Sequence, residues 1–255
     1  MTVALTPVDF ADVRPDVLAH LGGLVSPPES FYERHILNAN HYRIYVDGAP
    51  AGFVAIHGEG LLTQFAMLEK YTRYAQEAFF RLRHQESMRE ALVLTSDESF
   101  MIHALDGHKQ VVSQSHVLRR ATVIPGPVRD FTLQKSSLRD LEFIRESSGD
   151  FFGERLEAHL TAGAIYLTLR QGEPAGFGLI EKSALWDDVA SLGVFTIEAA
   201  RNSGAGTATI SLLLAECQRA NIRPLAGCAY YNHASKRTLG RAGMVAQSRL
   251  LRFSY

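Results

Sequence analysis

The stretch "YRIYVDGAPAGFVAI" (residues 42–56) has a counterpart in the second half of the chain, "IYLTLRQGEPAGFGLI" (residues 165–180). In each, an alternating run enters a turn and leaves through Pro-Ala-Gly-Phe into a second run, which predicts a β-hairpin. Self-similarity at a fixed separation is typical of an internal repeat. The hairpin therefore predicts that the chain contains two copies of one unit.

The similarity extends to both sides of the hairpin. A segment with helical spacing precedes it, a strand and a helix follow it, and a strand end, a short helix, a glycine and a last strand complete each copy. The matching segments are 29–40 with 149–163, 62–82 with 189–214, and 94–120 with 229–255. Coincidental α/β patterning is the alternative, and four segments in the same order argue against it.

A boundary is expected in "VIPGPVRD" (residues 123–130), where Pro125, Gly126 and Pro127 interrupt regular structure. We therefore expect two domains, residues 1–125 and 126–255. Both halves have an ordinary domain size.

Composition indicates a globular protein. Of the 255 residues, 46% are hydrophobic and 21% are charged, which is enough apolar material for a substantial core and argues against disorder. The net charge of -1 gives no reason to expect nucleic acid or an anionic membrane as a partner. The N-terminus has no signal-peptide pattern and no run is long enough to span a membrane, so we expect a cytoplasmic protein.

Cysteines and histidines do not indicate a metal site. Cys217 and Cys228 have no metal-binding spacing, and we expect two buried core residues. The histidines of the first half also lack clustered spacing, so no metal is expected; they are His35, His41, His57, His103, His108 and His116.

A glycine-rich loop, "RNSGAGTA" (residues 201–208), joins an apolar strand to a helix. The helix is predicted from a stripe of apolar residues at Ile210, Leu213, Leu214 and Cys217. A helix start favours an anion, Gly204 and Gly206 let a phosphate approach the backbone, and Arg201 adds positive charge. An ordinary strand-to-helix connector is the alternative.

The tail "NHASKRTLGRAGM" (residues 232–244) predicts a short helix with Asn232 as its N-terminal cap and Gly243 at its C-terminal end. Together, the loop and the tail resemble the GNAT superfamily of acyl-CoA-dependent N-acyltransferases. Two family signatures match, the pyrophosphate loop [QR]xxGx[GA] at Arg201, Gly204 and Gly206, and a second motif at Asn232, Ser235, Arg241, Gly243 and Met244.

The resemblance covers residues 130–255 by motif and the first half by repeat pattern alone. It implies an α/β (α+β) fold of two tandem GNAT-like domains, each a mixed, mostly antiparallel sheet flanked by helices. It also implies acetyl-CoA as cosubstrate and no metal.

The resemblance assigns cofactor-binding residues. Backbone amides of the loop would hold the CoA pyrophosphate beside Arg201; these belong to Asn202, Ser203, Gly204, Ala205, Gly206 and Thr207. Val194, Phe195 and Thr196 would pair with the pantetheine arm. Asn232 would hydrogen-bond that arm, Ser235 and Arg241 would flank the cofactor, and the thioester would lie where strands splay at Gly193.

The catalytic groups are less defined. The family often has a tyrosine acid seven residues after the motif asparagine, but here this residue is Leu239. Tyr230 and Tyr231 are the candidate replacements. Candidate bases are Glu181, Asp187 and Asp188, and a strand amide after Leu192 could polarise the thioester. Proximity in the ternary complex could also suffice without a dedicated acid.

The first copy lacks both motifs. Tyr71, Tyr74 and Gln76 replace the glycine loop and would crowd a pyrophosphate, and "SDES" (residues 96–99) replaces the asparagine. We therefore expect a degenerate, noncatalytic first domain.

The leading hypothesis is an N-acetyltransferase that acts on a primary amine of a small molecule or peptide, as a monomer or homodimer. A noncatalytic acyl-CoA-binding or regulatory protein is the alternative, and an unrelated nucleotide-phosphate binder is a third.

Overall fold

The computed structural model describes residues 2–85, 88–120 and 129–255. By its contacts the chain divides into two compact units. Unit 1 comprises Met1–Val117 with Gln247–Tyr255, and unit 2 comprises Leu118–Ala246. The boundary expected between residues 125 and 126 lies outside the described residues.

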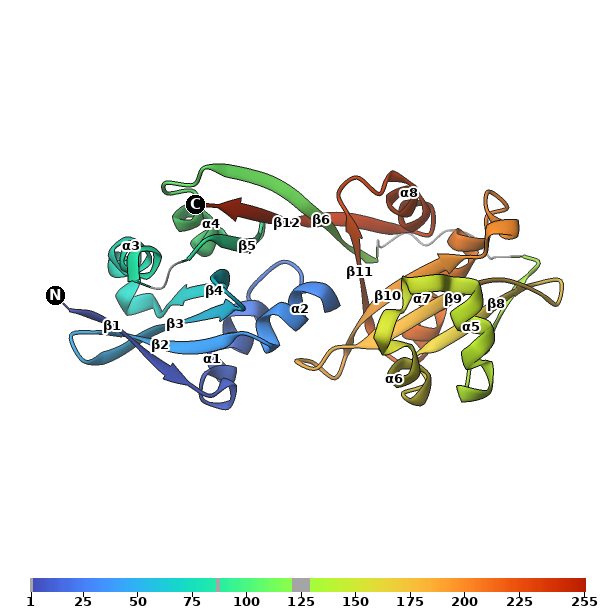
Figure 1. Ribbon diagram of the computed structural model, residues 1–255, viewed down its shortest axis with the longest axis horizontal. Helices are drawn as coiled ribbons and strands as arrows, with labels where there is room; N and C mark the ends of the chain where they lie inside the picture. Colours follow the sequence, from blue (N-terminus) through green and yellow to red (C-terminus); the bar gives the residue numbers. More distant parts are fainter. Residues whose placement is uncertain (1, 86–87, 121–128) are drawn as a thin grey trace. The chain divides into compact units, whose positions relative to one another are not determined.

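Unit 1 is a mixed sheet with helices (Figure 1). Its strands lie in the order β1-β2-β3-β4-β5-β12-β6. Neighbouring strands are antiparallel from β1 to β4 and between β5 and β12, whereas β4 and β5 are parallel. The elements are β1 (Val3–Val8), α1 (Phe10–Gly22), α2 (Ser30–Leu37), β2 (Asn40–Val46), β3 (Ala49–His57), β4 (Leu61–Met67), α3 (Ala75–Gln85), β5 (Glu90–Leu94), α4 (Glu98–Ala104), β6 (Gln110–Arg120) and β12 (Met244–Ser254).

The last strand of the chain completes unit 1. By sequence β12 ends the second repeat, but from Gln247 on it packs in unit 1, where it pairs with β5 (Figure 1, red). Phe253 of β12 is fully buried in the same core cluster as Phe65 and Phe79. Unit 1 therefore needs residues from both ends of the chain.

Unit 2 repeats the arrangement. Its strands lie in the order β11-β10-β9-β8-β7, antiparallel except for the parallel pair β10 and β11. From Leu118 on, β6 belongs to this unit, next to β11. The elements are β7 (Phe131–Lys135), α5 (Leu141–Ser148), α6 (Leu156–Thr161), β8 (Ile165–Arg170), β9 (Glu173–Lys182), β10 (Val189–Thr196), α7 (Ala205–Arg219), β11 (Arg223–Ala229) and α8 (His233–Arg241).

The repeated Pro-Ala-Gly-Phe begins the second strand of a hairpin in each unit, β2–β3 and β8–β9. Its glycine has a packing reason. A Cβ on Gly52 would lie 2.2 Å from the carbonyl oxygen of Ala66, and one on Gly176 would lie 2.4 Å from that of Phe195. Only glycine fits because the next strand passes so close.

The fold class expected from the sequence is confirmed, with mixed and mostly antiparallel strands flanked by helices. The expected stripe of α7 is buried throughout, and so are both cysteines. Burial raises the pKa of Cys217 to about 11. In the part of the chain that the structure describes, no helix is long and apolar enough to cross a membrane.

Candidate functional site

A cavity of about 880 Å³ opens in unit 2 between the end of β10, the start of α7 and helix α8. It brings together the predicted cofactor-binding residues, which come from separate elements. Those that line it are Val194, Phe195, Thr196, Arg201, Asn202, Gly204, Ala205, Gly206, Thr207, Asn232, Ser235 and Arg241. Of the predicted set, only Ser203 is not in the lining.

The cavity begins where β10 and β11 separate. Among the described residues, these strands pair in parallel from Val189 to Ser191 of β10. On its other edge β10 continues to pair with β9 as far as Thr196. Consequently one edge of β10 from Leu192 onward faces the cavity, and its backbone donors and acceptors are available to a ligand.

The glycine loop presents the N-terminus of α7 to this space. Gly204 is the N-cap with a φ of +87°, a conformation that suits glycine, and no side chain caps the helix. The N–H groups of a first helical turn lack intrahelical partners and carry partial positive charge. The first turn also contains no acidic residue. This is a favourable geometry for an anion.

Close packing explains the second glycine of the loop. A Cβ on Gly206 would lie 2.9 Å from Oγ1 of Thr196 and 3.2 Å from Cγ2 of Thr238. Gly206 thus allows α7 to lie against both β10 and α8.

Helix α8 forms another wall. Asn232 caps it, because its side-chain oxygen accepts a hydrogen bond from the backbone N–H of Ser235 at 3.0 Å. Leu239, at the position of the family's tyrosine, lines the cavity and is buried. An apolar side chain there cannot donate a proton.

None of the five candidate catalytic residues is in the cavity lining; these are Glu181, Asp187, Asp188, Tyr230 and Tyr231. Asp188 binds Arg223 with both carboxylate oxygens, at 2.7 and 3.1 Å, and this hydrogen bonding lowers the pKa of Asp188. Tyr230 and Tyr231 are exposed, Tyr231 by 76%.

Glu181, on β9, lies beside the point where β10 and β11 separate. It is directly opposite Ser191, the last residue of β10 in the parallel register with β11. Its carboxylate forms a 2.6 Å ion pair with Arg155, and its side chain is 18% exposed. Glu181 and Leu179 share a face of β9. A Cβ on Gly193 would lie 3.3 Å from Leu179 and 3.8 Å from the Phe151 ring.

The lining also contains residues that the sequence reasoning missed, among them Phe151, Cys228, Arg237 and Thr238. Arg237 lies one turn before Arg241 on α8, so helical spacing could have revealed it. Phe151 lies in a short 3-10 helix far from both motifs, and no local pattern pointed to it. Among the residues described, no group of three or more His, Cys, Asp or Glu side chains could hold a metal ion.

In unit 1, an aromatic side chain lies at a strand position that lines the cavity in unit 2. The strand registers place Phe65 where unit 2 has Val194, and Gln64 where it has Gly193. The Phe65 ring packs against Phe79 of α3 at 5.1 Å and against His103 of α4 at 5.6 Å. In unit 1, β4, α3 and α4 are the counterparts of the strand and helices that border the cavity in unit 2. Here they contact one another through these side chains.

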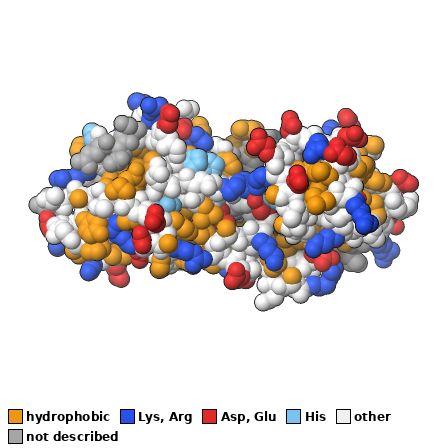
Figure 2. All heavy atoms as spheres, turned by 60° about the horizontal axis from the view of Figure 1, so that its bottom comes forward, with side chains coloured by type: hydrophobic (Ala, Val, Ile, Leu, Met, Phe, Trp, Pro, Cys, Tyr) orange, Lys and Arg blue, Asp and Glu red, His pale blue; other side chains and the backbone are white. Residues whose placement is uncertain are grey.

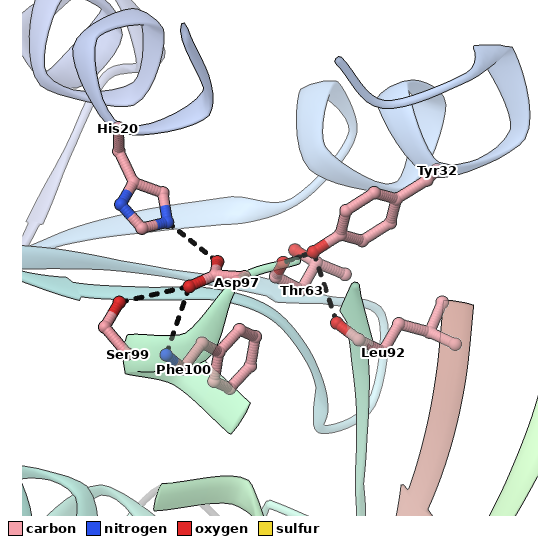
Figure 3. Close-up of polar contacts among 7 residues, drawn as sticks. All are labelled: His20, Tyr32, Thr63, Leu92, Asp97, Ser99 and Phe100. Carbon is pink, nitrogen blue, oxygen red and sulfur yellow. Dashed lines mark hydrogen bonds and ion pairs between the residues drawn. The ribbon is translucent and has the colours of Figure 1, made fainter. Parts of the chain in front are cut away.

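A tyrosine also joins β4 and β5 where they separate (Figure 3). The buried Tyr32 hydroxyl donates to the carbonyl oxygens of Thr63 on β4 at 2.5 Å and of Leu92 on β5 at 3.2 Å. Among the described residues, the parallel pairing of β4 with β5 ends one residue earlier, at Leu62 and Ala91. Burial raises the pKa of Tyr32 well above its ordinary value, and the nearby Asp97 raises it further.

Asp97 occupies the capping position of α4 that Asn232 has on α8. One oxygen accepts from the backbone N–H of Phe100 at 3.1 Å, and the other lies 2.7 Å from Nε2 of His20 (Figure 3). The polar groups that would face a ligand in unit 2 are thus bonded internally in unit 1.

Comparison with known proteins points to one family. Residues 10–120 match a family model described as an acetyltransferase (GNAT) domain. No curated protein matches the chain.

Solved structures resemble the chain over its whole length. A GNAT-family acetyltransferase from Colwellia psychrerythraea is 16% identical, with a TM-score of 0.88 and 99% of both chains covered. A tandem GNAT protein from the clavulanic acid biosynthesis pathway is 12% identical, with a TM-score of 0.61 and coverage of 100% of this chain and 98% of its own. A GCN5-related N-acetyltransferase from Sphaerobacter thermophilus is 13% identical, with a TM-score of 0.59 and coverage of 99% and 95%. At these identities the likeness shows the fold.

Proposed function

We propose that this chain is an N-acetyltransferase of the GNAT superfamily, because residues 10–120 match the family's domain model and a solved GNAT-family acetyltransferase shares its fold throughout. It transfers an acetyl group from acetyl-CoA to a primary amine of a small molecule or peptide. The observation that carries the proposal is the cavity of unit 2, where the open edge of β10, the N-terminus of α7 and the cap of α8 meet.

Each wall has a part in binding the cosubstrate. The first-turn N–H groups of α7 and the guanidinium of Arg201 hold the diphosphate of CoA. The free edge of β10 at Val194–Thr196 pairs with the amides of the pantetheine arm, in the manner of an added strand. Asn232 donates its side-chain amide to the same arm.

The chemistry requires one acyl transfer, one proton lost from the amine nitrogen to a base and one proton gained by the leaving thiolate. The acceptor amine loses a proton, its nitrogen attacks the thioester carbonyl carbon, and the C–S bond breaks, so that CoA leaves and is protonated at sulfur. We assign the proton acceptor to Glu181, directly or through water, because it lies opposite the point where the strands part. A strand amide after Leu192 polarises the carbonyl, and alignment of the two substrates supplies much of the rate.

A noncatalytic acyl-CoA-binding or regulatory role is the second candidate. It is favoured by Leu239, which places an apolar side chain in the lining where the family often has its acid. Release of free thiol from acetyl-CoA over a panel of primary amines distinguishes the two. Release above the hydrolysis background supports the enzyme, whereas CoA binding without release for any amine supports the second candidate.

The binding site itself is tested by Gly204→Glu, with CoA affinity measured by calorimetry. A carboxylate at the start of α7 repels the diphosphate, and we expect affinity to fall by about a hundredfold or more.

Gly172→Glu is the matched control. Gly172 has a similar φ of +92° and, like Gly204, has nothing within 4 Å of an added Cβ, so both variants carry the same strain and the same charge. Gly172 lies in the β8–β9 turn, outside the cavity lining. Equal CoA affinity in the two variants would contradict the assignment of the loop.

A further inference from the structure

The cavity of unit 2 has an unbalanced charge. Arg201, Arg237 and Arg241 line it, and within the described residues its lining contains no aspartate or glutamate. On the face shown in Figure 2, by contrast, basic and acidic side chains are intermixed. The whole chain is also nearly neutral, with a net charge of -1. The excess of arginine is therefore local to the cavity.

Two of these arginines have no acidic partner. Arg201 lies 3.8 Å from Glu198. No ion pair or hydrogen bond of the Arg237 or Arg241 side chain is found in the part of the chain that is described, whereas Arg155 and Arg223 each bind a carboxylate. Arg237 and Arg241 are also four residues apart on α8, where like charges repel and destabilise a helix.

Helix stability explains the presence of Arg241 on α8 but not that of Arg237. Arg241 lies in the last turn of α8, where a cation interacts favourably with the helix dipole. Arg237 lies in the middle of the helix and gains no such stabilisation. A side chain that is exposed, unpaired and repelled by its neighbour is better explained by a ligand.

CoA has two anionic parts, and only one of them is not yet assigned to residues of the cavity. In the proposed function, the diphosphate is bound by the first-turn N–H groups of α7 and by Arg201, which lies in the loop before α7. The remaining anion of CoA is the phosphate monoester at the 3′ position of its ribose. Such a group carries between one and two negative charges at neutral pH and accepts bidentate hydrogen bonds from guanidinium groups.

We infer that Arg237 and Arg241 form a subsite for the 3′-phosphate, and that this subsite makes the protein selective for CoA over 3′-dephospho-CoA. The inference rests on the proposed function and names the part of the ligand that α8 binds. Arg237 is then a specificity-determining residue.

The test compares the affinity of the full chain for CoA and for 3′-dephospho-CoA by calorimetry. Because hydrogen bonds to charged groups are each worth a modest free energy at an exposed site, we expect the wild-type protein to prefer CoA by about tenfold. In Arg237→Gln, and more so in the double variant with Arg241→Gln, this preference falls toward one. The affinity for 3′-dephospho-CoA stays unchanged.

Lys236→Gln is the matched control. Lys236 precedes Arg237 on α8 and carries the same charge, but it does not line the cavity. Its variant should retain the wild-type preference. A loss of preference equal to that of Arg237→Gln would show that only the general charge of α8 matters and would overturn the inference. Thermal unfolding of each variant checks that the fold is intact.

The remaining outcomes distinguish a failure of the 3′-phosphate subsite from a failure of the proposed function. Equal wild-type affinity for both ligands overturns the subsite and leaves the function standing. An equal loss for both ligands in the arginine variants also overturns the subsite, because the residues would then contact a part that the ligands share. Binding of neither ligand by the wild-type protein contradicts the proposed function as well.

Discussion

At the scale of single residues, the candidate bases differ in how they lie relative to the point where β10 and β11 separate. Asp188 is exposed and fully engaged by Arg223. Glu181 lies opposite Ser191 and on the same strand face as Leu179, which contacts the region of Gly193. Its ion pair with Arg155 holds the carboxylate in one orientation. Glu181 is therefore the better candidate to accept a proton from an amine bound near the opening.

We predict that Glu181→Gln lowers the turnover number by about a hundredfold or more, the usual contribution of a general base. The affinity for CoA should be unchanged, because Glu181 is not part of the cavity lining. Steady-state kinetics with the best amine of the panel, together with CoA calorimetry, measures both effects. Glu173→Gln, the same change at the exposed start of β9, should match the wild-type protein. Wild-type turnover in Glu181→Gln would remove Glu181 from the mechanism.

At the scale of elements, the same strand arrangement has opposite consequences in the two units. In unit 2, the separation of β10 from β11 opens a cavity against α7 and α8. In unit 1, the separation of β4 from β5 is spanned by the hydroxyl of Tyr32, and Phe65 packs against α3 and α4. In this chain, the diverging strands of unit 2 thus border a cavity, whereas those of unit 1 are joined by side-chain contacts.

We predict that Tyr32→Phe lowers the free energy of unfolding by about 1–3 kcal/mol, because it leaves two buried carbonyl oxygens without their hydroxyl donor. Affinity for CoA should not change, since Tyr32 belongs to unit 1. Denaturant unfolding and calorimetry test the two parts. Tyr42→Phe is the control, as the hydroxyl of this half-buried residue has no hydrogen-bond partner among the described residues. Equal unfolding free energies for both variants would show that the bridge contributes nothing.

At the scale of the whole molecule, family likeness and the cavity fall on different halves. The family model matches residues 10–120, whereas the cavity is lined by residues from Phe151 to Arg241. The half of the chain that matches the family model is thus not the half that contains this cavity. The first unit also depends on the C-terminal strand, because Phe253 of β12 is part of its core. An isolated fragment of residues 1–125 would lack this strand.

We predict that the full chain binds a single CoA molecule, at unit 2. Calorimetric stoichiometry measures this directly, and in Gly204→Glu no site of wild-type affinity should remain. The physical reason is that in unit 1 the Phe65 ring packs against α3 and α4 at the strand position where unit 2 has Val194. Two bound CoA molecules, or one site of wild-type affinity in the variant, would show that unit 1 also binds the cosubstrate.

The sequence by itself determined the local structure. The hairpins, the apolar stripe of α7 and the cap at Asn232 follow from alternation, helical spacing and capping chemistry, which act between residues close in the chain. Most of the cofactor-binding residues predicted from the two motifs line the cavity. This part of the prediction needed no tertiary information, because each motif lies on a single loop or helix beside the cavity.

Only the tertiary structure decided the rest. The pairing of β12 with β5 joins residues about 160 positions apart in the chain, as in Phe253 with Ala91, and no local pattern selects one distant strand over another. Likewise, Phe151 reaches the cavity, and Glu181 stays outside its lining, through packing between separate elements. Where two neighbouring strands separate, the space between them is either open or occupied by side chains. Which of the two occurs depends on the volumes of the side chains that the fold brings together there. At equivalent strand positions, the large Phe65 ring packs against Phe79 of α3 in unit 1, whereas the smaller Val194 lines the cavity in unit 2.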